Sequence, residues 1–126
     1  MVNPKQLRLG NYIKDRGGKV LRIDFMEHVQ EGYDTKLGQI MQLEGQEVHP
    51  MTEYTDYANP IPIIEEWLLR FGFELEEGWY WKSSLRLFNI RGLYFRANFP
   101  IKADILYVHS LQNLYFALTG EELEIK

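Results

Sequence analysis

Alternation of hydrophobic and polar positions dominates the first half of the chain. Leu21, Ile23 and Phe25 alternate with polar residues, and a period of two places these three side chains on one face of a strand. Short strands at regular spacing are typical of a small curled sheet or barrel. Further strands are expected at three places, separated by turns that contain glycine: residues 7–13, 39–43 and 47–49.

A helical period replaces the alternation after residue 62. Apolar residues recur there at intervals of three and four, and a glycine follows in the position of a C-terminal stop: Ile64, Trp67, Leu68, Phe71 and Gly72. Pro60 and Pro62 disfavour a regular ladder just before this helix. We therefore expect two halves, residues 1–58 and 59–126, or one compact domain.

The second half continues with strands and ends in a helix. Strands are expected over residues 79–82, 85–91 and 93–98, with a more buried one over 105–108. The last helix begins at His109 or Ser110, and its apolar stripe and glycine stop are Leu111, Leu114, Tyr115, Leu118 and Gly120. The predicted fold is α+β: a small antiparallel β-barrel-like half, then a helix, a sheet of three or four antiparallel strands and a C-terminal helix.

Two segments resemble an uncharacterised family of small proteins found in gut anaerobe genomes, prophages and their phages. Residues 107–120 contain the usual core of that family, Leu-Gln-Asn-Leu-Tyr-Phe-Ala-Leu-Thr-Gly, and residues 60–73 contain its Pro-Ile-Pro motif before Glu-Glu-Trp-Leu. The chain departs from the family at Ile64, where a polar N-cap residue is usual, so we expect a shifted or weaker helix start. The resemblance implies kinship with proteins of phages and mobile elements, and it implies no activity.

The opening of the chain also resembles the start of SH3-like barrels. Residues 7–13 are followed by the turn at Gly17 and Gly18 and by a second strand, and in such barrels a strand follows a glycine. The resemblance covers about 50 residues, and barrels of this kind bind peptides, RNA, DNA or no ligand.

Composition excludes several chemistries. The 126 residues include no cysteine, which rules out disulfides, thiolate nucleophiles and zinc–thiolate sites. The N-terminus lacks a basic region followed by an apolar run, and every apolar run is far shorter than the ~20 residues that cross a bilayer. We therefore expect a cytoplasmic protein with no membrane partner.

Candidate catalytic groups are scattered along the chain. His28, His49 and His109 show no metal-ligand spacing. Glycine-rich phosphate loops and serine-nucleophile motifs do not occur in the sequence either. We expect a protein that is not an enzyme and that uses no cofactor and no metal.

Positive charge is concentrated in one segment. Residues 79–103 carry five basic residues and no acidic one, although the net charge of the chain is −4. On two of its strands, aromatic, cationic and amide side chains share one face, a combination used by proteins that bind single-stranded nucleic acid. A solvated sheet face, whose charges offset the acidic segments beside it, is the interpretation we prefer. The candidate binding residues are Tyr80, Lys82, Arg86, Tyr94, Arg96 and Asn98.

The C-terminal motif contains four polar or exposed candidates that helix formation alone does not explain. His109 lies at a helix N-terminus, where the helix dipole disfavours a protonated ring, so we expect a neutral, structural imidazole. The amides of Gln112 and Asn113 can anchor a neighbouring strand or the backbone of a partner. Phe116 belongs to a helix that is apolar all round, which indicates either a central core helix or a contact with a partner.

The function that we predict is that of a small, non-enzymatic interaction or accessory protein of a phage or mobile element. It would act through a protein partner or through self-association. The alternative prediction is single-stranded nucleic-acid binding through residues 79–103.

Overall fold

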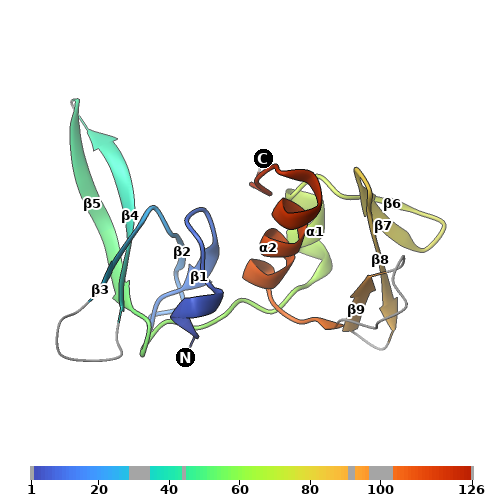
Figure 1. Ribbon diagram of the computed structural model, residues 1–126, viewed down its shortest axis with the longest axis horizontal. Coiled ribbons are helices and arrows are strands. Elements are labelled where there is room, and N and C mark those ends of the chain that lie inside the picture. Colours follow the sequence, from blue (N-terminus) through green and yellow to red (C-terminus); the bar gives the residue numbers. More distant parts are fainter. Residues whose placement is uncertain (1, 29–34, 44, 91–92, 97–103, 126) are drawn as a thin grey trace. The chain divides into compact units, whose positions relative to one another are not determined.

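The computed structural model describes residues 2–28, 35–43, 45–90, 93–96 and 104–125. The chain divides into two compact units, Met1–Ile61 and Pro62–Lys126. Antiparallel sheets occur in both units, and the α-helices that the structure describes belong to the second (Figure 1). The α+β class predicted from the sequence is confirmed.

The N-terminal unit contains two antiparallel sheets. The first joins β1 to β2, and the second has the order β3–β4–β5. Within the described residues these sheets do not close into a barrel, so a barrel-like half is not confirmed. The elements are the 3-10 helix η1 (Pro4–Gln6), β1 (Tyr12–Lys14), β2 (Val20–Arg22), β3 (Phe25–His28), β4 (Thr35–Leu43) and β5 (Gln46–Tyr54).

The alternating segment at residues 20–25 is shared between the two sheets. The Asp24 carboxylate accepts a hydrogen bond from the N–H of Ile40 on β4 at 2.7 Å and forms an ion pair with Arg22 at 2.8 Å. The bond from Ile40 holds Asp24 against β4 at the point where β2 has ended and β3 has not yet begun. The prediction of one continuous strand here is wrong, although Leu21 and Ile23 are both fully buried as expected.

The core of the N-terminal unit lies between its two sheets. Inward-facing residues of both sheets meet there, and Met51 packs against them. The aromatic ring of Phe25 covers Gly38, its partner in the ladder, so closely that an added Cβ would lie 2.0 Å from the ring. The buried cluster is Val2, Leu7, Ile13, Leu21, Ile23, Leu37 and Ala58.

The C-terminal unit is a five-stranded antiparallel sheet with the order β10–β9–β8–β7–β6. Both helices of this unit lie on one side of its sheet, and no described element of the same unit covers the other side (Figure 1). The elements are α1 (Glu65–Arg70), β6 (Glu74–Glu76), β7 (Trp79–Lys82), β8 (Leu85–Ile90), β9 (Leu93–Arg96), β10 (Asp104–Ile105) and α2 (Val108–Thr119).

The ends of the two helices follow the sequence signals. Ile64, expected in the apolar stripe of the helix, instead occupies the N-cap position of α1 without a side-chain hydrogen bond and is 51% exposed, so α1 starts only at Glu65. Gly72 and Gly120 follow the helices with φ of 91° and 75°, values in the left-handed region that glycine adopts without strain. Both predicted glycine stops are confirmed.

Two features of the sheet differ from the prediction. The acidic strand β6 was not expected, because glutamate is a poor strand former. The predicted buried strand over residues 105–108 is wrong: β10 ends at Ile105, Leu106 is 45% exposed, and Val108 already belongs to α2.

Arg16 and Glu53 join the two sheets of the N-terminal unit. Glu53 Oε2 accepts hydrogen bonds from the backbone N–H and the Nε of Arg16 at 2.9 and 3.2 Å, and Oε1 accepts one from Nη2 at 3.1 Å. The guanidinium also lies 4.0 Å from the centre of the Tyr57 ring. These hydrogen bonds from Arg16 lower the pKa of Glu53 from 4.5 to about 2, against the opposing effect of burial. The β1–β2 turn is thereby bonded to the end of β5.

We expect Glu53→Gln to remove a stabilisation that depends on pH. Because the pKa of Glu53 is lowered on folding, its contribution is complete above the unfolded value of 4.5 and is lost as the pH falls towards about 2. Urea unfolding followed by circular dichroism should show a lower midpoint for the variant at pH 7 and a smaller difference from wild type in acid. Glu47→Gln, on the exposed part of β5, is the control. Parallel pH profiles for wild type and Glu53→Gln would contradict the prediction.

Candidate functional site

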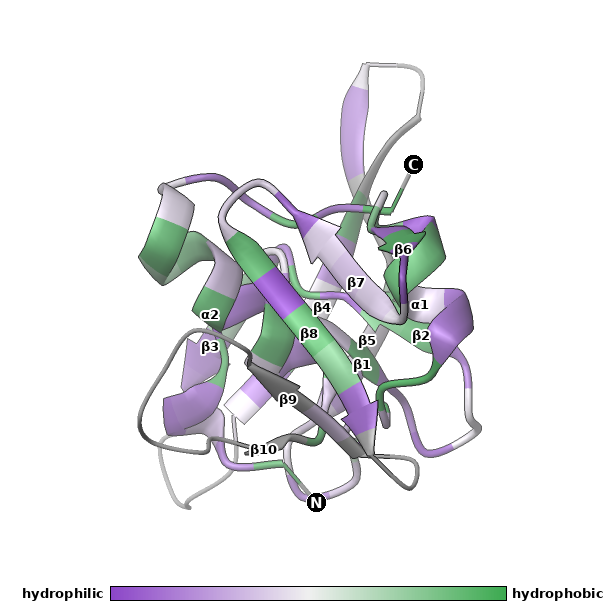
Figure 2. Cartoon of the chain, turned by 90° about the vertical axis from the view of Figure 1, so that its right-hand side faces the viewer, coloured by the Kyte–Doolittle hydropathy of each residue, from purple (hydrophilic) through white to green (hydrophobic). Residues whose placement is uncertain are grey.

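The register of the C-terminal sheet sorts its side chains onto two faces. Tyr80 pairs with Leu87 on the next strand, and Trp79 pairs with Phe88. Since neighbouring residues of a strand point to opposite faces, these two pairs lie on different sides of the sheet. Tyr80 and Leu87 are buried, whereas Trp79 is 41% exposed. The face that carries Tyr80 is therefore the one covered by the helices, and Trp79 lies on the other face. Figure 2 looks onto β7 and β8 from the side away from the helices.

The predicted tyrosines belong to the covered face. Tyr80 and Tyr94 are 6% and 5% exposed, and their rings make an edge-on contact with centroids 5.8 Å apart. The Tyr80 hydroxyl donates a hydrogen bond to the Glu65 carboxylate of α1. Burial, and then this bond, raise the pKa of Tyr80. The prediction of a base-stacking surface made of these tyrosines is wrong, because both rings are part of the core.

Lys82 also points to the covered face. Its Nζ donates a hydrogen bond to the backbone oxygen of Phe71 at 2.5 Å and lies 5.7 Å from the centre of the Tyr115 ring on α2. The ammonium group therefore bonds to the end of α1 and contacts α2. It is not available to a phosphate on the open face.

The remaining predicted binding residues do not form one surface with these. Arg86 is exposed and lies opposite Trp81 on the open face. Arg96 pairs with Leu87 through its backbone, and its side chain lies outside what the structure describes. Asn98 lies outside the described residues.

The open face carries an aromatic surface that the sequence analysis did not select. Trp79 and Phe88 contact each other edge to face with ring centroids 5.3 Å apart. Trp81 is half-buried beside Arg86, its ladder partner. We call Trp79, Trp81, Arg86 and Phe88 the open aromatic face. The alternation of residues 79–82 already places the two tryptophans on the face opposite Tyr80. It does not reveal which of the two faces the helices cover.

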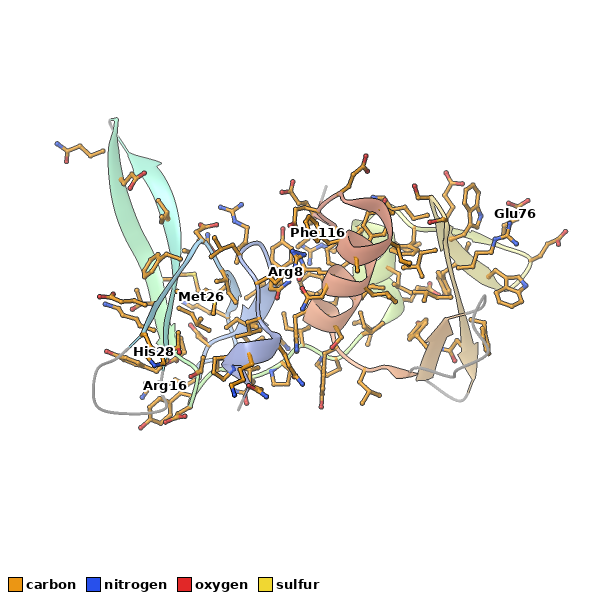
Figure 3. The ribbon with its side chains drawn as sticks, viewed as in Figure 1. Arg8, Arg16, Met26, His28, Glu76 and Phe116 are labelled. Carbon is orange, nitrogen blue, oxygen red and sulfur yellow. The ribbon has the colours of Figure 1, made fainter. Side chains whose placement is uncertain are left out.

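A hollow of about 300 Å³ adjoins the open aromatic face. Glu76 projects from β6 on the side of the sheet away from the helices (Figure 3). The walls combine two indole rings, two carboxylates and one guanidinium, so the hollow offers stacking surfaces together with both signs of charge. Its lining residues are Glu76, Glu77, Trp79, Trp81 and Arg86.

The candidates in the C-terminal motif divide between the core and the surface. Gln112 is fully buried, and its Nε2 donates a hydrogen bond to the backbone oxygen of Leu123 at 3.0 Å. Asn113 is half-buried, and Phe116 is 40% exposed. The amide of Gln112 therefore anchors the C-terminal tail, which is not a strand, in place of the neighbouring strand that was expected.

His109 is buried at the start of α2. Its ring is 3% exposed and stacks on that of Tyr107, with centroids 5.7 Å apart and planes 6° from parallel. Nδ1 makes no hydrogen bond within the described structure. Burial lowers the pKa of His109, so the ring is neutral at pH 7. This environment agrees with a structural imidazole.

Among the residues that the structure describes, no group of three or more His, Cys, Asp or Glu side chains is arranged to hold a metal ion. No helix in this part of the chain is long and apolar enough to span a membrane. The chain matches no protein-family model, and comparison with curated proteins and with solved structures gives no significant match.

We expect His109→Gln to weaken the pH dependence of stability in mild acid. The folded state disfavours the protonated ring, so below the ordinary pKa of 6.5 the unfolded chain binds a proton that the folded chain does not, and stability falls. Unfolding followed by tryptophan fluorescence reports on the C-terminal unit, which contains all three tryptophans. The variant should lose less stability than wild type between pH 8 and pH 5. His28→Gln, which changes an exposed ring, should behave as wild type does.

Gln112→Leu tests the bond that anchors the C-terminal tail. Leucine fills a similar volume but leaves the Leu123 carbonyl without its donor, so we expect a loss of about 1 to 3 kcal/mol in the free energy of unfolding. Asn113→Leu, one position along the helix and half-buried, is the comparison and should have a smaller effect. Equal midpoints for Gln112→Leu and wild type in urea would show that the bond contributes little.

Proposed function

We propose that this chain is a small, non-enzymatic interaction protein that binds a protein partner through the open aromatic face. The observation that carries the proposal is the exposure of Trp79, at 41%, beside Phe88 on a sheet face that no described element of the C-terminal unit covers. Exposed apolar patches commonly mark interaction sites, and tryptophan and arginine are enriched among the residues that dominate binding energy. The open aromatic face has this composition.

Charge supports a protein partner over single-stranded nucleic acid. Of the described side chains that line the hollow, Arg86 is the only cation, and it is accompanied by Glu76 and Glu77. Carboxylates repel phosphates, and nucleic-acid affinity depends on several cations that neutralise the backbone. Lys82 bonds inside the unit. Among the side chains that the structure describes, the open face therefore has stacking surfaces without the positive surroundings of a nucleic-acid groove.

The setting of this function is proposed from the sequence resemblance. Residues 60–73 and 107–120 support an accessory role in a phage or mobile element, acting in the cytoplasm. A relationship of the N-terminal unit to SH3-like barrels is proposed on similar grounds. It is supported by Gly10, which has φ of 91° shortly before β1, and by the turn that connects β1 to β2.

Selection from a random peptide library on the immobilised protein tests the proposal. Peptides that bind should lose about 2 kcal/mol or more, roughly thirtyfold in Kd, with Trp79→Ala, as is typical of a central interface tryptophan. Leu9→Ala removes an exposed apolar residue in the N-terminal unit and should leave binding unchanged.

Labelled single-stranded DNA and RNA at low salt provide the competing measurement. We expect no binding. Nucleic-acid binding that is lost with Arg86→Ala would indicate that the partner is a nucleic acid and not a protein. In the peptide experiment, binding that is insensitive to both Trp79→Ala and Phe88→Ala would reject the open aromatic face as the binding site.

A further inference from the structure

Strand β6 is an edge of the C-terminal sheet beside the open aromatic face. It pairs with β7 on one side, and none of the described strands pairs with its other side. The register aligns Glu74 with Trp81 and Glu76 with Trp79. Each row of side chains on the open face therefore begins with a glutamate at the edge and continues with an indole on β7.

The backbone of β6 offers hydrogen-bonding groups at this edge. Glu77 and Gly78 connect β6 to β7 with φ of 51° and 84°, the two left-handed residues of a type I′ hairpin turn. In such a turn the flanking pair, Glu76 and Trp79, is the hydrogen-bonded one. Because bonded and non-bonded pairs alternate along an antiparallel ladder, Leu75 belongs to a non-bonded pair. The N–H and C=O of Leu75 therefore point away from β7, towards the free edge.

The side chains of β6 differ between its two faces. Glu74 and Glu76 lie on the open face with the indoles, and Leu75 lies on the opposite face and is 52% exposed. An exposed leucine between two glutamates at a free edge defines a pattern for a neighbouring strand. Residues that align with the glutamates should be basic, and the residue that aligns with Leu75 should be apolar.

We propose that β6 accepts an extended segment of a partner protein as an additional strand, and that this segment alternates basic and apolar residues. The inference rests on the proposed protein-binding function and specifies the class of partner. Main-chain hydrogen bonds to Leu75 hold the segment, and alternate side chains supply the selectivity, as in other cases of strand addition.

The hollow explains why the basic residues of the added segment should have long side chains. A lysine or arginine aligned with Glu76 lies one strand spacing, about 4.8 Å, outside β6. Its side chain can extend over the glutamate towards the hollow, where Glu77 carries a further negative charge and Trp79 offers a ring face to a cation. Of the charged side chains that line the hollow, Glu76 and Glu77 are carboxylates and Arg86 is a cation, so the charge balance of the lining favours a basic side chain.

The same charges disfavour pairing between two copies of the chain. If two β6 strands added to each other, their glutamates would lie opposite or diagonal to one another, and like charges in those positions are destabilising. The edge therefore selects a foreign segment of opposite charge over a second copy.

The test uses a short synthetic peptide in which lysine and valine alternate. Binding is followed by tryptophan fluorescence and by calorimetry on the full chain. A peptide with glutamate in place of every lysine is the charge control and should not bind. We expect Glu74→Gln with Glu76→Gln to weaken binding of the lysine peptide about tenfold or more. Glu121→Gln with Glu124→Gln makes the same change of net charge at exposed positions after α2 and should have little effect.

Two further changes test the strand addition itself. Leu75→Pro removes the outward N–H but no bond to β7, and should abolish binding, whereas Leu75→Thr keeps the N–H and should retain most of it. If Leu75→Pro does not fold, methylated peptides give the answer with wild-type protein. Methylation of the valine amides blocks an antiparallel added strand, and methylation of the lysine amides blocks a parallel one. Binding that survives both methylations would overturn the proposal.

The outcomes separate this inference from the proposed function. If the lysine peptide does not bind but library peptides do so through Trp79, the choice of β6 and of a basic segment is wrong and the open aromatic face stands. Binding of the lysine and glutamate peptides with equal affinity would also overturn the inference. If no peptide binds at all, both the inference and the proposed function fail.

Discussion

The C-terminal unit depends on one constraint: the pleat of its sheet allows only one of two residue sets to be buried. Tyr80 and Leu87 pack on the side of the helices, and Tyr80 is fixed there by the hydrogen bond to Glu65 of α1. Because successive residues of a strand alternate, burying this set places Trp79 and Phe88 on the other side. A shift of register by one residue would exchange the two sets and bury the indoles. The exposure of the tryptophans thus follows from the same pairing that builds the core.

A feature of the fold could be predicted from the sequence where neighbouring residues determine it, and could not where residues distant in sequence determine it. The glycine stops at Gly72 and Gly120 were predictable, because a left-handed residue at a helix end is a local requirement. The alternation at Leu21 and Ile23 was predictable for the same reason, but the break after them was not, since it depends on a bond between Asp24 and a strand distant in sequence.

The candidate site shows the same limit more clearly. The sequence specifies that Trp79 and Tyr80 lie on opposite faces of a strand, and it does not specify which face α1 and α2 cover. A tyrosine is amphipathic and fits either a buried or an exposed face. Packing against the helices therefore determines which face is buried. Lys82 was misassigned for a related reason: its charge indicated solvent, whereas the end of α1 supplies a carbonyl that accepts its hydrogen bond. A half-buried cation with a main-chain partner leaves no local signal.

The acidic edge next to the open aromatic face combines protection against unwanted strand pairing with attraction for a partner strand, two requirements that usually conflict. A free sheet edge attracts other strands, and proteins commonly protect such edges by making them short and charged. Strand β6 has both properties, yet Leu75 is exposed between its two glutamates and the indoles of β7 lie one row behind them. Protection by charge alone would be served equally well by a polar residue at position 75. An apolar residue there adds attraction on one face while the glutamates retain repulsion on the other, so the edge excludes its own copies and discriminates among foreign strands by their charge.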